Sequence, residues 1–242
     1  IVHNYTLLEK KATILFGAKF YKSNNSGQQG PGSNGSGPDL NFATAQYIDY
    51  KAQSDYDYPN LNTAFFGEQV IYLKENLSIT PGFRFEYIKT ESDGYYKNIN
   101  LDAADNLLLN ETIYSEETRE RSFILLGVGA SYKPTKYLEL YTNFSQNYRS
   151  VTFADISIVN PAFLINPNIT DEKGFNSDFG MRGVFNKVIS YDFSVFGLFY
   201  NDRIGFVPVV TPKGVRSERG NVGKAVIYGL ESLVDFNLIE LF

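Results

Sequence analysis

The chain has 242 residues and a formal net charge of −5, and it contains no Cys, no Trp and a single His. These counts exclude a disulfide scaffold, thiolate metal sites and Cys nucleophiles, and His3 alone cannot supply a multi-His metal site. The net acidity argues against nucleic-acid binding, which needs a basic surface. We therefore expect neither a cofactor nor a nucleic-acid partner.

Apolar and polar residues alternate with a period of two along most of the chain, which is typical of β-strands. In the clearest segment, 77–88, the apolar side chains share one face, and Arg84 and Glu86 lie on the other. No segment shows the periodicity of an amphipathic helix. Strands are predicted over 1–7, 12–21, 63–73, 77–88, 122–132, 138–144, 175–183, 191–199 and 226–236. The pattern predicts an all-β protein with about nine strands.

The connections alternate strictly between short and long. Short ones are predicted at 8–10, 74–76, 133–136 and 186–188, and long ones at 23–60, 90–118, 150–173 and 202–222. An antiparallel meander with this alternation places every short turn at one rim and every long loop at the other. Outer-membrane barrels have this asymmetry, whereas compact soluble domains rarely carry so many long loops. The chain has no run of 18 apolar residues, but a spanning strand needs none.

The faces opposite the apolar ones carry charges, which suit a polar lumen better than an apolar core. A soluble antiparallel β-sandwich, with these charges facing water, is the alternative. These charged residues are Arg84, Glu86, Glu139, Asp178, Arg182, Asp192 and Glu231.

Residues 23–38 consist only of Ser, Asn, Gly, Gln and Pro, which predicts a mobile loop. Such a loop is either a lid that contacts a ligand or a solvated spacer.

Several motifs follow one another in an order typical of one family. LELYTNFS at 138–145 is followed by YRSVTF at 148–153, and NPNIT at 166–170 precedes the pair Glu172-Lys173 and GMRG at 180–183. LSITPGFRFEY stands upstream at 77–87, and FYNDRI at 199–204, GNVGK at 220–224 and YGLE at 228–231 stand downstream. Together these motifs resemble the barrel of TonB-dependent outer-membrane receptors over about 62–236. The stretch near 29–36 is similar to receptors of the ferric-dicitrate type.

The resemblance implies a transmembrane barrel of about 22 strands with a plugged lumen. Nine strands in 242 residues is roughly 27 residues per strand, so a whole barrel at this rate needs roughly 590 residues. We therefore expect residues 1–242 to be one portion of the barrel domain, without the plug domain or a TonB box. The absence of an initiator Met and the loss of alternation before Phe242 lead to the same expectation of a truncated chain.

The resemblance also implies a function. A receptor of this family sits in the outer membrane of a Gram-negative bacterium, among lipid and lipopolysaccharide, and takes up a scarce ligand, usually a ferric siderophore or ferric citrate. Energy comes from the TonB complex, which acts through the plug region. The expected protein is a transporter, not an enzyme. The alternative is a surface adhesin, or a structural or passive barrel without energised transport.

Charge in the long loops is the basis for predicting a ligand site. Residues 203–224 carry a net charge of +4, and guanidinium groups bind carboxylates in a bidentate manner. The predicted ligand contacts are Arg149, Arg203, Arg216 and Arg219. Alternatively, these arginines form salt bridges among the loops or contact lipopolysaccharide phosphates.

The acidic residues of the loops allow other functional interpretations. Residues 91–121 carry a net charge of −5, which suits either Ca²⁺ binding or a solvated acidic face. The pairs Glu116-Glu117 and Asp171-Glu172 raise the idea of a glycosidase, but each lies in a predicted loop with no second carboxylate opposite.

Overall fold

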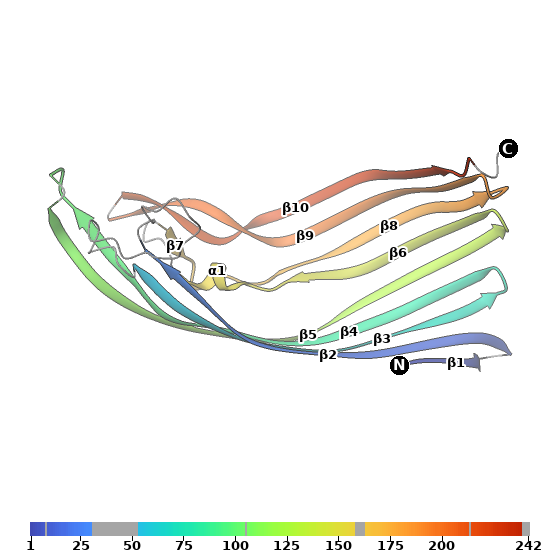
Figure 1. Cartoon of the computed structure of the whole chain (residues 1–242), viewed down its shortest axis with the longest axis horizontal. Helices are drawn as coiled ribbons and strands as arrows, with labels where there is room; N and C mark the ends of the chain where they lie inside the picture. The colour runs from blue at the N-terminus through green and yellow to red at the C-terminus, as the bar shows by residue number, and fades with distance from the viewer. Residues whose placement is uncertain (8, 31–52, 105, 158–162, 213, 239–242) are drawn as a thin grey trace.

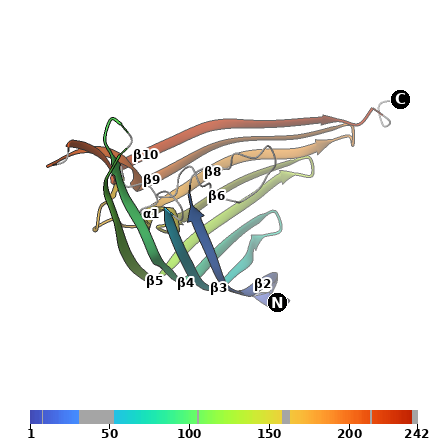
Figure 2. The ribbon, with the colours of Figure 1, turned by 60° about the vertical axis from the view of Figure 1, so that its left-hand side comes forward.

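The computed structural model describes the chain except for residues 8, 31–52, 105, 158–162, 213 and 239–242. One curved sheet contains every described strand (Figures 1 and 2). The long strands are β1 (Val2–Leu7), β2 (Lys10–Gln29), β3 (Ser54–Lys74), β4 (Leu77–Leu101), β5 (Leu107–Thr135), β6 (Leu138–Arg149), β8 (Glu172–Phe185), β9 (Ile189–Thr211) and β10 (Gly214–Phe236).

These nine strands pair antiparallel with their sequence neighbours, so the predicted meander is confirmed. Two short elements lie between β6 and β8. One is the single helical turn α1 (Phe153–Ile156), where no helix was expected. The other is β7 (Phe163–Ile165), which pairs in parallel with Ser217–Arg219 of β10. Among the described residues, no helix has the length and apolar character needed to cross a membrane.

The strands are much longer than the alternation predicted, and several predicted loops are therefore wrong. Residues 90–101 and 107–118 form the outer half of the β4–β5 hairpin, paired in register from Lys89↔Glu120 to Asn100↔Leu109. Residues 202–211 and 214–222 similarly belong to the β9–β10 hairpin, and residues 23–29 belong to β2. Alternation underestimates the strand lengths because the strands remain paired through their backbones beyond the part of the sheet that has one apolar face. The rest of the predicted loop at 23–38 lies mostly outside the described residues.

The turns that join β3 to β4, β5 to β6 and β8 to β9 all lie at one end of the sheet (Figure 1). The β9–β10 connection, predicted as a long loop, is also short, but it lies at the opposite end. The turn between β8 and β9 is closed by the Val188 amide, which donates to the Phe185 carbonyl at 3.0 Å. Its two central residues, Asn186 and Lys187, have φ of 49° and 61°. This left-handed geometry twists a hairpin in the same sense as its strands, which is why two-residue hairpin turns favour it.

The two faces of the sheet differ in polarity as the alternation predicted. Paired residues on neighbouring antiparallel strands share a face, so Phe65, Phe85 and Ile124 form one apolar row across three strands. The opposite face has Ala64, Glu86 and Phe123 in the adjacent row. Apolar-face side chains such as Phe179 (56% exposed) and Leu230 (82% exposed) have no covering layer.

The polar face is the concave one. Tyr58 shares the face of Glu86, and its ring stacks on Phe153 of α1 with centroids 4.9 Å apart. The helix α1 lies inside the curve of the sheet (Figure 2). A small apolar cluster of Val151, Ile156 and Ile169 holds the segment that contains α1, together with the partly buried Ile165 and Ile204.

The wall of the sheet opens between β5 and β6. Their ladder runs only from Gly127↔Ser145 to the short turn, while β4 and β5 continue past the end of β6 (Figure 1). Side chains bridge the start of the opening. Gln146 Oε1 accepts from the Leu126 amide at 2.9 Å, and the Phe123 and Tyr148 rings stack at 3.7 Å.

Candidate functional site

Three of the four predicted arginines meet on the concave side at the long-hairpin end. Arg149 ends β6, Arg203 lies on β9 and Arg219 lies on β10. Each of them pairs with a buried carboxylate of this chain, either Glu172 at the start of β8 or Asp155 in α1. We call these five residues the arginine cluster.

Glu172 joins two strands to the cluster. Its side chain is 1% exposed, and Arg149 Nη1 and Arg203 Nη1 each lie 2.9 Å from one of its carboxylate oxygens. The amide of Ile204 also donates to Oε1, at 2.9 Å. An ionised carboxylate is tolerated at this depth because charged and backbone donors replace its water.

Asp155 fixes α1 against the same arginines. Arg149 Nη2 lies 3.2 Å from one carboxylate oxygen, and Arg219 Nη1 lies 3.3 Å from the other. The amide and hydroxyl of Thr152 donate to Asp155 as well, at 2.7 and 2.8 Å, which caps the helical turn. Arg149 therefore bridges both carboxylates and ties α1 to β8.

The cluster carries one more positive than negative charge. Arg149 and Arg203 remain 40% exposed at the side chain, while Glu172 and Asp155 are almost fully buried. The accessible part of the cluster is therefore arginine side chain. An anion that approaches from the concave side meets positive charge, whereas the carboxylates lie behind it.

Asp171 forms a second junction next to the cluster. Arg121 Nε and the Val151 amide donate to one of its oxygens at 3.0 and 2.8 Å, and the Tyr148 hydroxyl donates to the other. Arg119 donates to the carbonyls of Ile169 and Pro167 at 3.2 and 3.4 Å. These contacts fasten the segment between β6 and β8 to β5.

The segment is fastened to the β9–β10 hairpin too. Asn221 Oδ1 accepts from the Thr170 amide at 2.8 Å, and Asn166 Nδ2 donates to Glu218 at 3.0 Å. The described parts of the predicted loop at 150–173 are thus structured, and they connect β5 on one side with β10 on the other across the concave face.

Arg216, the fourth predicted arginine, lies outside the cluster. It pairs with Val209 in the β9–β10 hairpin and lies near Tyr96 of β4. Burial raises the pKa of Tyr96, and the positive charge of Arg216 opposes that shift. The charge of Arg216 on the β9–β10 hairpin therefore acts on a tyrosine of the β4–β5 hairpin.

Sequence reasoning missed the partners of the arginines. Glu172 was noted only within a motif and, with Asp171, as a carboxylate pair of glycosidase type. In the structure these two carboxylates accept hydrogen bonds from different arginines and serve different junctions. No group of three or more acidic or His residues among the described positions is arranged to hold a metal ion.

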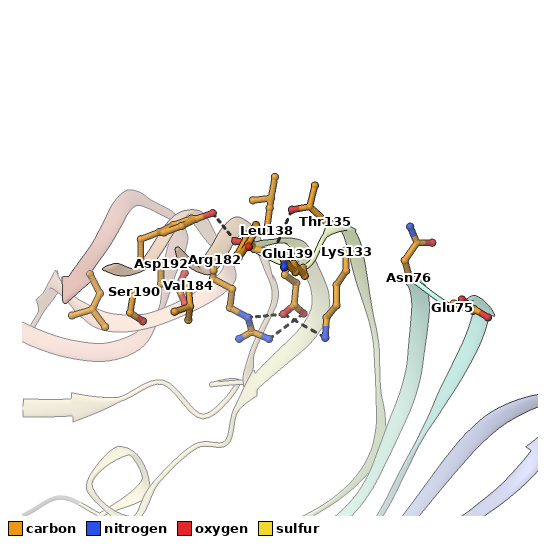
Figure 3. A pocket seen from close by; sticks show the side chains of 15 residues that line it. Glu75, Asn76, Lys133, Thr135, Leu138, Glu139, Arg182, Val184, Ser190 and Asp192 are labelled. Atoms are coloured by element: carbon orange, nitrogen blue, oxygen red, sulfur yellow. Dashed lines mark hydrogen bonds and ion pairs between the residues drawn. The ribbon is translucent and has the colours of Figure 1, made fainter. Parts of the chain in front are cut away.

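A second polar network lies at the short-turn end, beside a pocket of about 630 Å³. Figure 3 shows Arg182 and Lys133 directed at Glu139. Arg182 Nε lies 3.1 Å from Glu139 Oε2, so these two charges of the polar face pair with each other. The Ser131 hydroxyl donates to Glu139 at 2.7 Å, and the Tyr141 hydroxyl donates to Asp192 at 2.7 Å. This network pairs and hydrogen-bonds the charged groups of the polar face.

Residues 2–240 match the family model described as "TonB dependent receptor-like, beta-barrel". No curated protein matches the chain. Solved structures with the same fold include the ferric citrate transporter FecA in its unliganded form, with 16% identity, a TM-score of 0.68, and coverage of 100% of this chain and 31% of that one. The ferric-catecholate import receptor Fiu from K12 E. coli is 13% identical with a TM-score of 0.68, over 98% of this chain and 34% of that one.

The siderophore receptor PiuA from Acinetobacter baumannii has the same fold. It is 15% identical with a TM-score of 0.65, over 97% of this chain and 34% of that one. The chain therefore spans about a third of the length of each of these three structures.

Proposed function

Because the chain belongs to the family of TonB-dependent receptor-like β-barrels, we propose that it forms part of the wall of a receptor that takes up a ferric chelate, either a siderophore or ferric citrate. Barrels of this family lie in the outer membrane of Gram-negative bacteria, and the family consists of receptors and transporters, not enzymes. The observation that carries the proposal is the family match over almost the whole chain.

The form of the sheet supports a role as part of a larger barrel. The sheet has two described edges. One is β1, and the other is the part of β10 that follows Arg219; neither has a further strand partner among the described residues. Unpaired backbone groups are costly in lipid, so a membrane sheet closes into a barrel. Under this proposal the plug region and its contact with the TonB complex belong to parts of the receptor outside this chain.

The arginine cluster and Arg216 supply the proposed ligand contacts. The concave face at this end offers partly exposed arginine side chains backed by buried carboxylates, which favours an anionic chelate over a cationic one. Arg149, Arg203 and Arg219 would act through the part of each side chain that faces away from Glu172 and Asp155.

Uptake by the full-length receptor tests the function. Cells that lack the receptor gene should lose uptake of radioactive iron from ferric citrate or from one of a panel of ferric siderophores. The plasmid-borne gene should restore uptake, and a tonB deletion should abolish it again. Unchanged uptake of every chelate, together with reduced attachment of cells to surfaces, would support the adhesin alternative. Uptake without dependence on TonB would indicate a passive barrel.

The arginine proposal requires variants that separate ligand contact from folding. Arg203→Ala removes a ligand contact but also leaves Glu172 with one cation fewer. The double variant Arg203→Ala/Glu172→Gln removes the carboxylate charge as well. If Arg203 binds the chelate, both variants should weaken binding by about tenfold, a loss typical of a charged hydrogen bond. Recovery of affinity in the double variant would show that Arg203 serves only the internal ion pair.

A further inference from the structure

The strand β5 has an open backbone edge far from the ends of the sheet. In the meander its two neighbours are β4 and β6, both within this chain, so an added barrel strand has no place beside it. The β4 ladder covers one edge along almost the whole of β5. On the other edge, the β6 ladder ends at Gly127↔Ser145, and no described strand pairs with Leu107–Leu125.

The directions of the backbone groups follow from one hydrogen bond. The Leu126 amide donates toward β6, to Gln146 Oε1. In an extended strand, alternate residues direct their N–H and C=O groups to the same side. Because the β4–β5 register has no shift between Leu109 and Tyr132, the amides of the even-numbered residues from Thr112 to Ser122 also point to the open edge.

The same even-numbered residues present exposed, partly acidic side chains. Tyr114 is 79% exposed, and Glu116, Thr118 and Glu120 are exposed as well. Glu116 lies opposite Asp93, which in turn lies opposite Asp57, so three exposed carboxylates form a row across β3, β4 and β5. Like charges in directly opposed positions destabilise a sheet and favour a cation nearby.

The chain covers the corresponding edge of β10. There β7 pairs in parallel with Ser217–Arg219, and the amide of Asn166 donates to the Arg219 carbonyl at 2.9 Å. The edge of β5 has no such strand among the described residues. In the β9–β10 hairpin, the free edge of β10 is therefore covered by an added strand, β7. In the β4–β5 hairpin, the free edge of β5 has no added strand among the described residues.

We propose that the open edge of β5 from Thr112 to Ser122 binds an extended, basic strand of a partner protein by β-augmentation. Backbone bonds to the even-numbered residues provide the affinity. One Lys or Arg side chain of the partner extends the carboxylate row beside Glu116, and another lies near Glu120. A second copy of this chain fits poorly, because pairing of two β5 edges brings Glu116 and Glu120 of one copy toward the same acidic residues of the other. The stretch accommodates about ten residues of partner strand at roughly 3.4 Å per residue.

A basic peptide is a direct probe of the edge. We would use a fluorescent ten-residue peptide in which Lys alternates with Val, and measure anisotropy with the full-length receptor in detergent. The matched control peptide carries N-methyl groups on alternate backbone nitrogens, so it keeps its charge but cannot complete a ladder. The proposal expects binding of the first peptide and at least about tenfold weaker binding of the second.

Substitutions at Thr118 separate the edge from the rest of the fold. Thr118→Pro removes an amide that points to the open edge, so the β4 ladder stays intact, and Pro is tolerated at such a position. Thr118→Val keeps the amide and serves as the control. We expect Thr118→Pro to weaken peptide binding about tenfold and Thr118→Val to leave it unchanged, while both retain the heat-modifiable gel mobility of a folded barrel.

Three results would overturn the proposal. The first is no binding of the unmodified peptide. The second is equal binding of the two peptides, or of folded Thr118→Pro and Thr118→Val, which would show adsorption by charge alone. The third is dimerisation of the receptor without peptide that is abolished by Thr118→Pro, since the occupant would then be a second copy.

Discussion

Glu172 shows how one buried carboxylate organises the concave side. Its two oxygens accept from arginines on β6 and β9 and from the Ile204 amide, so its loss removes three bonds at once. The arginines left behind are 40% exposed and become hydrated, which limits the cost compared with a fully buried pair.

We predict that Glu172→Ala loosens the segment between β6 and β8 without unfolding the barrel. The local stability should fall by about 1–3 kcal/mol, as expected for loss of charged hydrogen bonds to partly exposed partners. Hydrogen exchange of peptides covering 163–171 measures the change. Glu231→Gln, on an exposed residue of β10, is the matched control and should leave this exchange unchanged. Equal exchange in the two variants would contradict a structural role for Glu172.

Asp102 gives the tip of the β4–β5 hairpin a pH dependence. Hydrogen bonds from the Asn106 side chain and amide and from the Ala104 amide lower the pKa of Asp102. A lowered pKa in the folded state means that this stabilisation is present above the ordinary value of the unfolded chain. It is lost as the pH falls through the lowered pKa.

A spin label at Ala103→Cys tests this sign, because the chain has no other cysteine. The label should become more mobile as the pH falls below 4 and should stay unchanged between pH 5 and pH 8. In the Asp102→Asn background the pH dependence below 4 should disappear. A wild-type transition near neutral pH would show that another group controls the tip.

At the scale of elements, alternation located all nine strands but not their lengths. Segment 77–88 was identified because lipid-facing and lumen-facing side chains must differ in polarity. The strand β4 begins at Leu77, as expected. The same strand continues to Leu101 through polar residues such as Ser92 and Asn98, where both faces meet water or protein. Backbone pairing in this outer part continues the register set in the alternating part of the strand. The residue pattern of the single strand therefore does not predict where the pairing ends.

The site was predictable only in part for a related reason. The type and number of the loop arginines identified Arg149, Arg203 and Arg219, but their partners depend on which hairpins approach each other. Asp155 lies in a helical turn that the sequence periodicity did not predict. Its ion pair with Arg219 joins residues 64 positions apart in the sequence. The general alternative of salt bridges among loops was available, whereas the particular pairs required the three-dimensional arrangement.

The β8–β9 turn yields a prediction at this scale. Lys187 adopts φ of 61°, a region that costs a residue with a side chain about 1 kcal/mol or more and costs Gly little. We expect Lys187→Gly to raise the free energy of unfolding by up to about 1 kcal/mol. Lys187→Val should lower it by a similar amount. Urea unfolding of the receptor in detergent measures both, with Lys136→Gly as a control in a turn without positive φ.

At the scale of the whole molecule, the asymmetry of the two ends and the difference between the two faces define an orientation. Outer-membrane barrels direct short turns to the periplasm and long extensions to the outside. The hairpins β4–β5 and β9–β10 extend well beyond the apolar face at one end, while the turns at 74–77 and 185–189 close the other (Figure 1). The carboxylate row and the arginine cluster would then both face the cell exterior.

Single cysteines in the otherwise cysteine-free chain test this orientation in the full-length receptor. Tyr114→Cys, on an exposed side chain of the long hairpin, should react with a membrane-impermeant maleimide on intact cells. Lys187→Cys, at a short turn, should react only after the outer membrane is permeabilised. Both side chains are exposed, so both cysteines should react once the outer membrane is permeabilised. A difference that appears only on intact cells therefore reports which side of the membrane each site faces. Labelling of Lys187→Cys, but not of Tyr114→Cys, on intact cells would reverse the orientation. The arginine cluster would then lie on the periplasmic side, where it could not be the first contact of an incoming chelate.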